Sequence, residues 1–318
     1  MNTSPNPICQ LFGIKYPIVQ AGMIWCSGWE LASAAANSGI LGLIGAGSMY
    51  PHILREHIQK CKAATDKPFG VNVPLLYPDI EQHMDIIAEE GVKIVFTSAG
   101  NPRTWTQWLK DRGITVVHVV SSAKFAQKAA AAGVDAIVAE GFEAGGHNGR
   151  EETTTMCLIP EVRDAIDIPL IAAGGIGDGR SMLAARALGA DAVQIGSRFV
   201  ASEESSAHPS FKQSVVDAQE GSTVLTLKEI TPVRLIKNKF FADVQAHYDR
   251  GAEVEELRTL LGRGRAKKGM FEGDLNEGEL EIGQISSRIR EVKPVVDIVK
   301  ECIEEYNQAF QGLAKIEL

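Results

Sequence analysis

The first two thirds of the chain repeat one pattern of hydrophobic and polar positions. A short apolar run, often β-branched, ends at Gly, Ser, Asn or Pro, and an amphipathic stretch with helical spacing follows it. This alternation is typical of βα units whose parallel strands are buried on both faces. It predicts eight strands, at residues 17–20, 41–44, 70–73, 94–97, 115–119, 136–139, 170–173 and 192–195.

The stretches between these runs predict helices at residues 29–37, 51–62, 80–90, 104–112, 123–132, 160–165 and 180–188. Several are followed by a glycine that can adopt the left-handed conformation after a helix, namely Gly39, Gly91, Gly113, Gly133 and Gly189. Eight parallel strands with helical crossovers close naturally into a barrel, so we predict a TIM (β/α)₈ barrel. A doubly wound open sheet is the rival fold, but it usually has fewer strands.

The repeat stops after Arg198. Residues 200–290 have helical and loop-like patterns, and residues 295–310 form an amphipathic pattern suited to packing on the barrel exterior. We therefore expect a barrel domain over residues 1–200, completed by a C-terminal helical segment, 293–318. A smaller, mostly helical lid subdomain, residues 201–292, is expected over the barrel mouth.

Composition and charge narrow the classes of function. The net charge of −8 and the lack of a basic run with interleaved aromatic residues argue against nucleic acid as a partner. No apolar run approaches the length of a membrane span, and residues 1–13 lack the pattern of a signal peptide. Five scattered cysteines with no CxxC pair argue against a disulfide framework or a structural metal. We expect a cytoplasmic protein with no metal site, and a homodimer is one option for its assembly.

In a barrel, the loops after the strands converge at one face, where chemistry takes place. Gly174 and Gly175 follow the predicted strand 170–173, and Gly196 and Ser197 follow the strand 192–195. Glycines there let backbone N–H groups approach a phosphate beside a helix N-terminus, and one phosphate suffices for a mononucleotide such as FMN. The alternative is that these glycines only make tight turns.

Three polar residues near strand ends are further candidates. His147 ends a loop of small residues, Ala144-Gly145-Gly146, and can exchange a proton near neutral pH; the alternative is a bond to a loop carbonyl. Asn72 lies in an apolar strand, where it is either structural or a donor to a ligand. Glu140 directly follows the strand 136–139, where it either accepts from ligand hydroxyls or pairs with Arg198 or a lysine. We interpret His118, inside the strand 115–119, as a core residue.

The chain resembles the nitronate monooxygenase family, formerly called 2-nitropropane dioxygenases, which includes the flavin-dependent type II enoyl-ACP reductases. The resemblance rests on LFGIKYPIVQAGM (11–23), AEGFEAGGHNG (139–149), TTTM (153–156), IPLIAAGGIGDGRSM (168–182), GADAVQIGSRFV (189–200), ESSAHP (204–209) and GDLNEGELEIGQ (273–284). It implies a barrel that holds FMN, a smaller lid, and His147 as the catalytic residue. The cofactor contacts so expected, together with the two loops above, are Ala21, Gly22, Met23, Asn72, Glu140, Gly145, Gly146, Gly174, Gly175, Gln194, Gly196 and Ser197.

Three functions follow as hypotheses. The first is an FMN-dependent nitronate monooxygenase that converts alkyl nitronates and O₂ to a carbonyl compound and nitrite. The second is an NAD(P)H-dependent enoyl-ACP reductase; Glu140 favours it, because this position is often Gln in nitronate-oxidising relatives. In that case the basic segments 231–240 and 262–268 could attract an acidic acyl carrier protein or a dinucleotide, unless they are merely solvated. The third is a non-catalytic flavin-binding module.

Overall fold

A computed structural model describes residues 6–313 and closes the eight predicted strands into one barrel. The strands pair in parallel in the order β1-β2-β3-β4-β5-β6-β8-β9, and β9 returns to pair with β1. The predicted (β/α)₈ barrel is therefore confirmed. The strands are β1 (Ile18–Gln20), β2 (Leu41–Gly45), β3 (Phe69–Pro74), β4 (Ile94–Ser98), β5 (Thr115–Val120), β6 (Ala136–Glu140), β8 (Leu170–Ala173) and β9 (Ala192–Ile195).

Helices follow the strands at the predicted places. The five glycines expected after helices all have positive φ, from +68° at Gly113 to +105° at Gly189. The helices are α2 (Trp29–Asn37), α3 (Pro51–Ala64), α4 (Ile80–Glu89), α5 (Thr106–Lys110), α6 (Ala123–Ala131), α7 (Thr155–Ala165) and α8 (Gly179–Ala187). The short helices η1 (Ala46–Ser48), η2 (Pro102–Thr104) and α9 (Ser197–Val200) lie in the loops after β2, β4 and β9.

Helix α7 begins earlier than the prediction of residues 160–165. The predicted start was Pro160, and proline is favoured in the first turn of a helix. In the structure Pro160 lies inside the helix, and the start is fixed by Glu143, whose carboxylate accepts from the Thr155 N–H and Oγ1, both at 2.9 Å. A carboxylate at a helix N-terminus satisfies free N–H groups. Glu143 lies in the same connection between β6 and α7, twelve residues before Thr155, so the short-range capping signals of the sequence did not reveal this cap.

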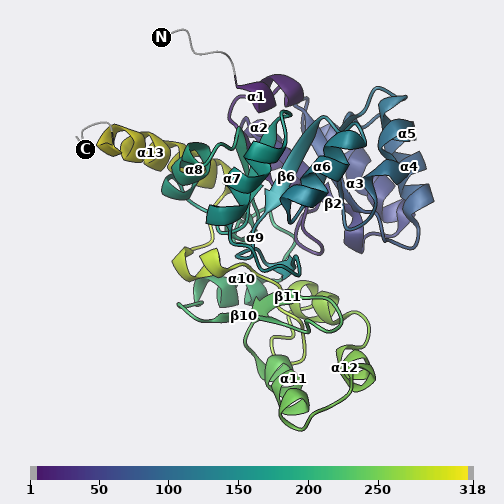
Figure 1. The fold of residues 1–318 in the computed structure, drawn as a ribbon, viewed down its shortest axis with the longest axis vertical. Helices are drawn as coiled ribbons and strands as arrows, with labels where there is room; N and C mark the ends of the chain where they lie inside the picture. Colours follow the sequence, from purple (N-terminus) through teal and green to yellow (C-terminus); the bar gives the residue numbers. More distant parts are fainter. Residues whose placement is uncertain (1–5, 314–318) are drawn as a thin grey trace.

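The barrel interior is apolar and is plugged at one end by a helix that the sequence analysis did not predict. Inward-facing residues such as Val19, Phe96 and Val138 form one buried cluster with Ile8 and Phe12 of α1 (Pro7–Phe12). The Phe12 and Phe96 rings lie 5.8 Å apart. Figure 1 shows α1 at the end of the barrel opposite to the chain beyond α9. One end of the barrel is thus filled by side chains, which leaves the other for a ligand.

The chain beyond α9 forms the lid at that other end (Figure 1). It contains α10 (Pro209–Val216), α11 (Lys239–Asp249), α12 (Val254–Leu261), η3 (Lys267–Phe271) and η4 (Gln284–Arg288). It also contributes two strands, β10 (Thr223–Thr226) and β11 (Val233–Ile236), to a small antiparallel sheet that the sequence analysis missed. The third strand, β7 (Gly146–His147), belongs to the barrel loop after β6, so this sheet joins lid and barrel.

The final helix, α13 (Val295–Leu313), returns to the barrel exterior and packs against α8. It buries Val295, Ile298, Val299 and Cys302, in agreement with the predicted amphipathic pattern. Residues 1–5 and 314–318, which end the expected segments 1–200 and 293–318, lie outside the described residues. No helix in the described part is both long and apolar enough to cross a membrane.

The role of α1 as a plug can be tested by truncating its buried ring. Phe12 is 3% exposed, and Phe12→Ala would leave a cavity against Phe96. We expect the free energy of unfolding, measured by urea denaturation, to fall by about 3–5 kcal/mol. Gln10→Ala, on the exposed side of the same helix, is the matched control and should change it by less than about 0.5 kcal/mol. An equal effect of the two substitutions would contradict the plug.

Candidate active site at the barrel mouth

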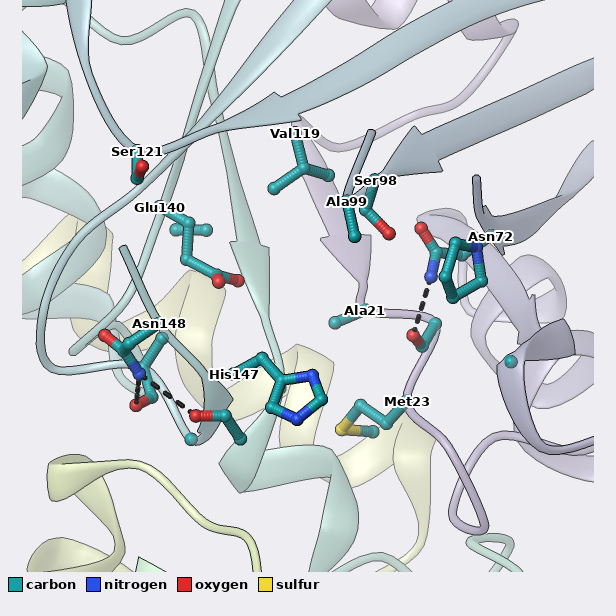
Figure 2. A pocket seen from close by; sticks show the side chains of 18 of the residues that line it. Ala21, Met23, Asn72, Ser98, Ala99, Val119, Ser121, Glu140, His147 and Asn148 are labelled. Carbon is teal, nitrogen blue, oxygen red and sulfur yellow. Dashed lines mark hydrogen bonds between the residues drawn. The ribbon is translucent and has the colours of Figure 1, made fainter. Parts of the chain in front are cut away.

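A cavity of about 1220 Å³ lies between the barrel mouth and the lid. All thirteen residues predicted for the site line it, although they come from five different loops and strand ends. They are Ala21, Gly22, Met23, Asn72, Glu140, Gly145, Gly146, His147, Gly174, Gly175, Gln194, Gly196 and Ser197. Figure 2 shows several of them around one space, with Glu140 and Asn72 on separate strands and His147 beside Met23.

Polar residues form the floor of the cavity because side chains alternate between the two faces of each strand. Ala136 and Val138 of β6 face the apolar barrel interior, so Glu140, two residues further on, faces the same way at its open end. Gln194 follows the inward-facing Ala192 of β9 in the same manner. The ladder places Glu140 and Gln194 at one level, on either side of Ala173.

Glu140 has no cationic partner on this floor. Burial raises the pKa of its carboxyl group to about 7, so a large fraction is neutral at physiological pH. The expected alternative, a pair with Arg198, is not formed, because that guanidinium donates to the carbonyl groups of Ala201 and Glu291. Glu140 therefore remains available to a ligand as a donor or an acceptor.

Asn72 has a structural role on the opposite side of the floor. Its Nδ2 donates to the Gly22 carbonyl at 3.2 Å, the bond drawn in Figure 2. A Cβ at Gly22 would lie 2.4 Å from the Cβ of Asn72, so only glycine fits there. The bond anchors the loop after β1 to β3. The sequence analysis favoured a ligand contact, and the structure supports the structural alternative for this amide nitrogen.

The glycine loop after β8 differs in one respect from the expected phosphate site. Gly174 and Gly175 have φ of +91° and +69°, as a tight turn requires. However, the N-terminus of α8 is already satisfied by carboxylates: Asp178 accepts from the Ser181 N–H, and Glu305 accepts from the Gly179 N–H. Two N–H groups at this helix N-terminus therefore already have carboxylate partners, and its contribution to phosphate binding stays a prediction. Within residues 6–313, the N–H of Gly175 has no protein acceptor and stays open to a phosphate.

His147 is exposed on the cavity wall, where β7 pairs with β11 through Val233. The two glycines before it make room for the lid. A Cβ at Gly145 would lie 2.4 Å from the Ile282 backbone, and one at Gly146, whose φ is +74°, would lie 2.6 Å from the Glu281 carboxylate. The sequence analysis expected both glycines to contact the cofactor. Their close contacts are instead with the lid segment 279–283, which fixes the loop that carries the imidazole.

That segment contributes two carboxyl groups that the sequence analysis missed. Glu281 lines the cavity, and Glu279 is 8% exposed and close enough to His147 for the imidazole to lower its pKa. Burial, the largest effect, still raises the pKa of both carboxyl groups. Both residues lie in the GDLNEGELEIGQ segment (273–284) that contributes to the family resemblance, but its acidic pattern alone does not distinguish a cavity wall from a solvated surface.

His118, predicted as a core residue, is buried, and its Nδ1 lies 2.7 Å from the Thr97 Oγ1. Burial lowers the pKa of its imidazole to about 4, so the ring is neutral at physiological pH. The residue also reaches the cavity wall. The sequence interpretation was therefore right about its burial.

Most cations of the basic segments 231–240 and 262–268 have partners within the protein. Arg234 is 2% exposed and donates to the Phe142 carbonyl. Lys239 and Arg265 pair with Glu277, and Lys267 and Lys268 pair with Glu272 and Asp274. Intramolecular carboxylates therefore already pair with several of these cations, and attraction of an acidic partner to these segments stays a prediction.

The residues present fit a flavin mononucleotide. Gln194 is 7% exposed, and its Oε1 has no hydrogen-bond partner in the described chain, although buried amide oxygens normally have one. This oxygen and Glu140 would hold the polar part of the flavin, the Gly175 loop would hold the phosphate, and Met23 and His147 would flank the ring. When bound, FMN supplies the redox chemistry, and the chain supplies binding, orientation and proton transfer.

Comparisons with known proteins agree with this architecture. A family model described as nitronate monooxygenase matches residues 6–83 and 77–305. FabK from Thermotoga maritima superimposes with a TM-score of 0.91 at 39% identity, over 98% of this chain and 99% of that one. A probable nitronate monooxygenase from Staphylococcus saprophyticus is 34% identical over 81% of this chain and 87% of the relative.

A third relative, a substituted indene-carboxyl-CoA dehydrogenase from Rhodococcus jostii, is 39% identical over 67% of this chain. The match spans only 60% of the length of that relative.

The raised pKa of Glu140 predicts a pH-dependent stability. A carboxyl group whose pKa is about 7 when folded and near 4.5 when unfolded holds its proton longer in the folded state, so stability falls as the pH rises from 4.5 to 7. Glu140→Gln removes this loss. We expect the free energy of unfolding of ligand-free protein, measured by urea denaturation, to rise for the variant relative to the wild type as the pH increases from 4.5 to 7. Above pH 7 this relative increase should reach about 1–3 kcal/mol. A difference that does not change with pH would contradict the assignment.

Proposed function

The chain belongs to the nitronate monooxygenase family, and from this premise we propose that it is an FMN-dependent oxidoreductase that oxidises alkyl nitronates with O₂ to a carbonyl compound and nitrite. The observation that carries the proposal is the unpartnered Gln194 Oε1 at the level of Glu140, on the floor of a cavity whose wall presents His147. Such buried polar groups call for a polar ligand that satisfies them.

The chain would contribute three things to the reaction. The floor residues and the Gly175 loop hold the cofactor. The lid segment 279–283, packed on Gly145 and Gly146, fixes the loop that carries His147 against the cavity. The exposed imidazole can then hold the anionic nitronate by hydrogen bond or charge and take or return a proton as the substrate changes its charge.

A second candidate is NAD(P)H-dependent reduction of enoyl thioesters carried by acyl carrier protein. It is favoured by the match to FabK, which covers 98% of this chain at 39% sequence identity. The match to the probable nitronate monooxygenase covers 81% of this chain at 34% sequence identity. Glu140, in place of the Gln found in many nitronate-oxidising relatives, points the same way. In this case His147 would orient or protonate the thioester.

One pair of mixing experiments separates the candidates. The FMN-loaded protein is mixed anaerobically with NADH and, separately, with propyl-2-nitronate, and flavin absorbance is followed. Nitrite release with O₂ uptake after admission of air supports the monooxygenase. Bleaching by NADH followed by turnover of crotonyl-CoA supports the reductase, and inertness to both would leave a non-catalytic flavin-binding module.

A substitution at His147 tests its role in either reaction. We expect His147→Asn to lower kcat/KM about 100-fold or more, because the protonatable imidazole is lost, while FMN content stays near that of the wild type. His52→Asn, on the exposed surface of α3 and away from the cavity lining, is the matched control and should leave kcat/KM unchanged. Full activity of His147→Asn would exclude a catalytic role for this residue.

A further inference from the structure

The cavity is larger than one ligand needs. Its volume of about 1220 Å³ exceeds the roughly 300–1,000 Å³ of most small-molecule sites. The proposed cofactor contacts lie mainly after β1, β6, β8 and β9. Another part of the lining comes from the loops after β3, β4 and β5 and from α6; we call this part the outer lobe, and its lining residues include Leu76, Arg103, Ser121, Phe125 and Lys128.

The charges in the cavity are separated. The carboxylates among the lining residues are Glu140, Glu143 and Glu281, which belong to β6, its loop and the lid. The lysine and arginine of the lining are Arg103 and Lys128, and both belong to the outer lobe. An anionic group attached to a bound ligand would therefore be attracted to the outer lobe rather than to the side that carries the carboxyl groups.

Arg103 and Lys128 come from neighbouring elements. Arg103 lies on η2, which packs against α6, the helix that carries Lys128. The Asn101 side chain accepts from the Arg103 N–H at 3.1 Å and so fixes the turn. Within residues 6–313 neither cation forms an ion pair with a carboxylate, in contrast to most cations of the lid segments 231–240 and 262–268.

The composition of the outer lobe indicates the kind of ligand. A guanidinium offers paired donors and an ammonium offers a compact charge, and the two together suit a phosphate better than a single carboxylate. Apolar side chains lie beside them: Leu76 is 78% exposed and Phe125 is 43% exposed, and the Lys128 ammonium lies 5.5 Å from the Phe125 ring centroid. A phosphate ester on an uncharged arm would match both features.

We propose that the outer lobe binds the phosphate ester of a second ligand, through Arg103 and Lys128, while the reactive end of that ligand lies beside His147. This inference rests on the proposed function, since it assumes that the inner part of the cavity holds the cofactor. The phosphate ester can come from a pantetheine-type thioester such as a coenzyme A derivative or from a nicotinamide dinucleotide. A small alkyl nitronate would not reach this lobe.

The test compares ligands with and without phosphate on the FMN-loaded protein. Dissociation constants for crotonyl-CoA, NADH and crotonyl-pantetheine, which lacks phosphate, are measured by calorimetry for the wild type, Arg103→Gln, Lys128→Gln and the double variant. We expect each single substitution to weaken a phosphate-bearing ligand by about tenfold, the usual size of a charged hydrogen bond, and to leave crotonyl-pantetheine unchanged. If only the affinity for crotonyl-CoA falls, the ligand of the outer lobe is a thioester. If only the affinity for NADH falls, it is a dinucleotide.

Lys124→Gln is the matched control, because Lys124 is exposed on the same helix but does not line the cavity. The inference is overturned if Arg103→Gln and Lys128→Gln bind all three ligands as the wild type does, or if Lys124→Gln weakens binding equally, since the effect would then be one of net charge. FMN content and circular dichroism verify that each variant is folded. A wild type that takes up no FMN contradicts the proposed function instead, and calorimetry with crotonyl-CoA still tests the lobe.

Discussion

Closure of the sheet by the pairing of β9 with β1 is the constraint on which the rest of the structure depends. A closed parallel barrel gives every strand one face toward the axis, so inward-facing residues stack in layers. Here the lower layers are apolar and are sealed by Phe12, whereas the layer at the open end includes Glu140 and Gln194. The position of the cavity follows from this change of polarity along the strands. The lid then completes the cavity.

The parts of the fold that depend on local pattern could be predicted from the sequence. Strands buried on both faces are continuous apolar runs, and the glycines after the helices have the positive φ that their positions required. Because parallel strands end at one face, the strand order together with the family resemblance could bring the thirteen candidate residues together, and all of them line one cavity. Their roles toward a cofactor remain proposals.

What the sequence did not reveal depends on contacts between distant segments. Glu143 caps α7 from twelve residues upstream in the loop that precedes the helix, and Glu305 of α13 accepts from the first N–H group of α8. Glycine is required at position 145 because the backbone of Ile282 packs against it, and no local sequence pattern indicates this contact. The carboxyl group of Glu281 becomes part of the cavity only because β11 holds the lid segment in place, through its bridge to Leu235. The lid therefore covers the site and also fixes the loop of residues 145–147, which carries His147.

The central claim is that the polar layer at the barrel mouth binds FMN, and an equilibrium titration tests it most directly. Protein freed of flavin is titrated with FMN while flavin fluorescence is followed, for the wild type and for Gln194→Leu, which replaces the unpartnered amide by an apolar group of similar size. The account predicts saturable binding of one FMN per chain and about tenfold weaker binding by the folded variant. Absence of saturable binding to the wild type, or equal affinity of the two proteins, would contradict it.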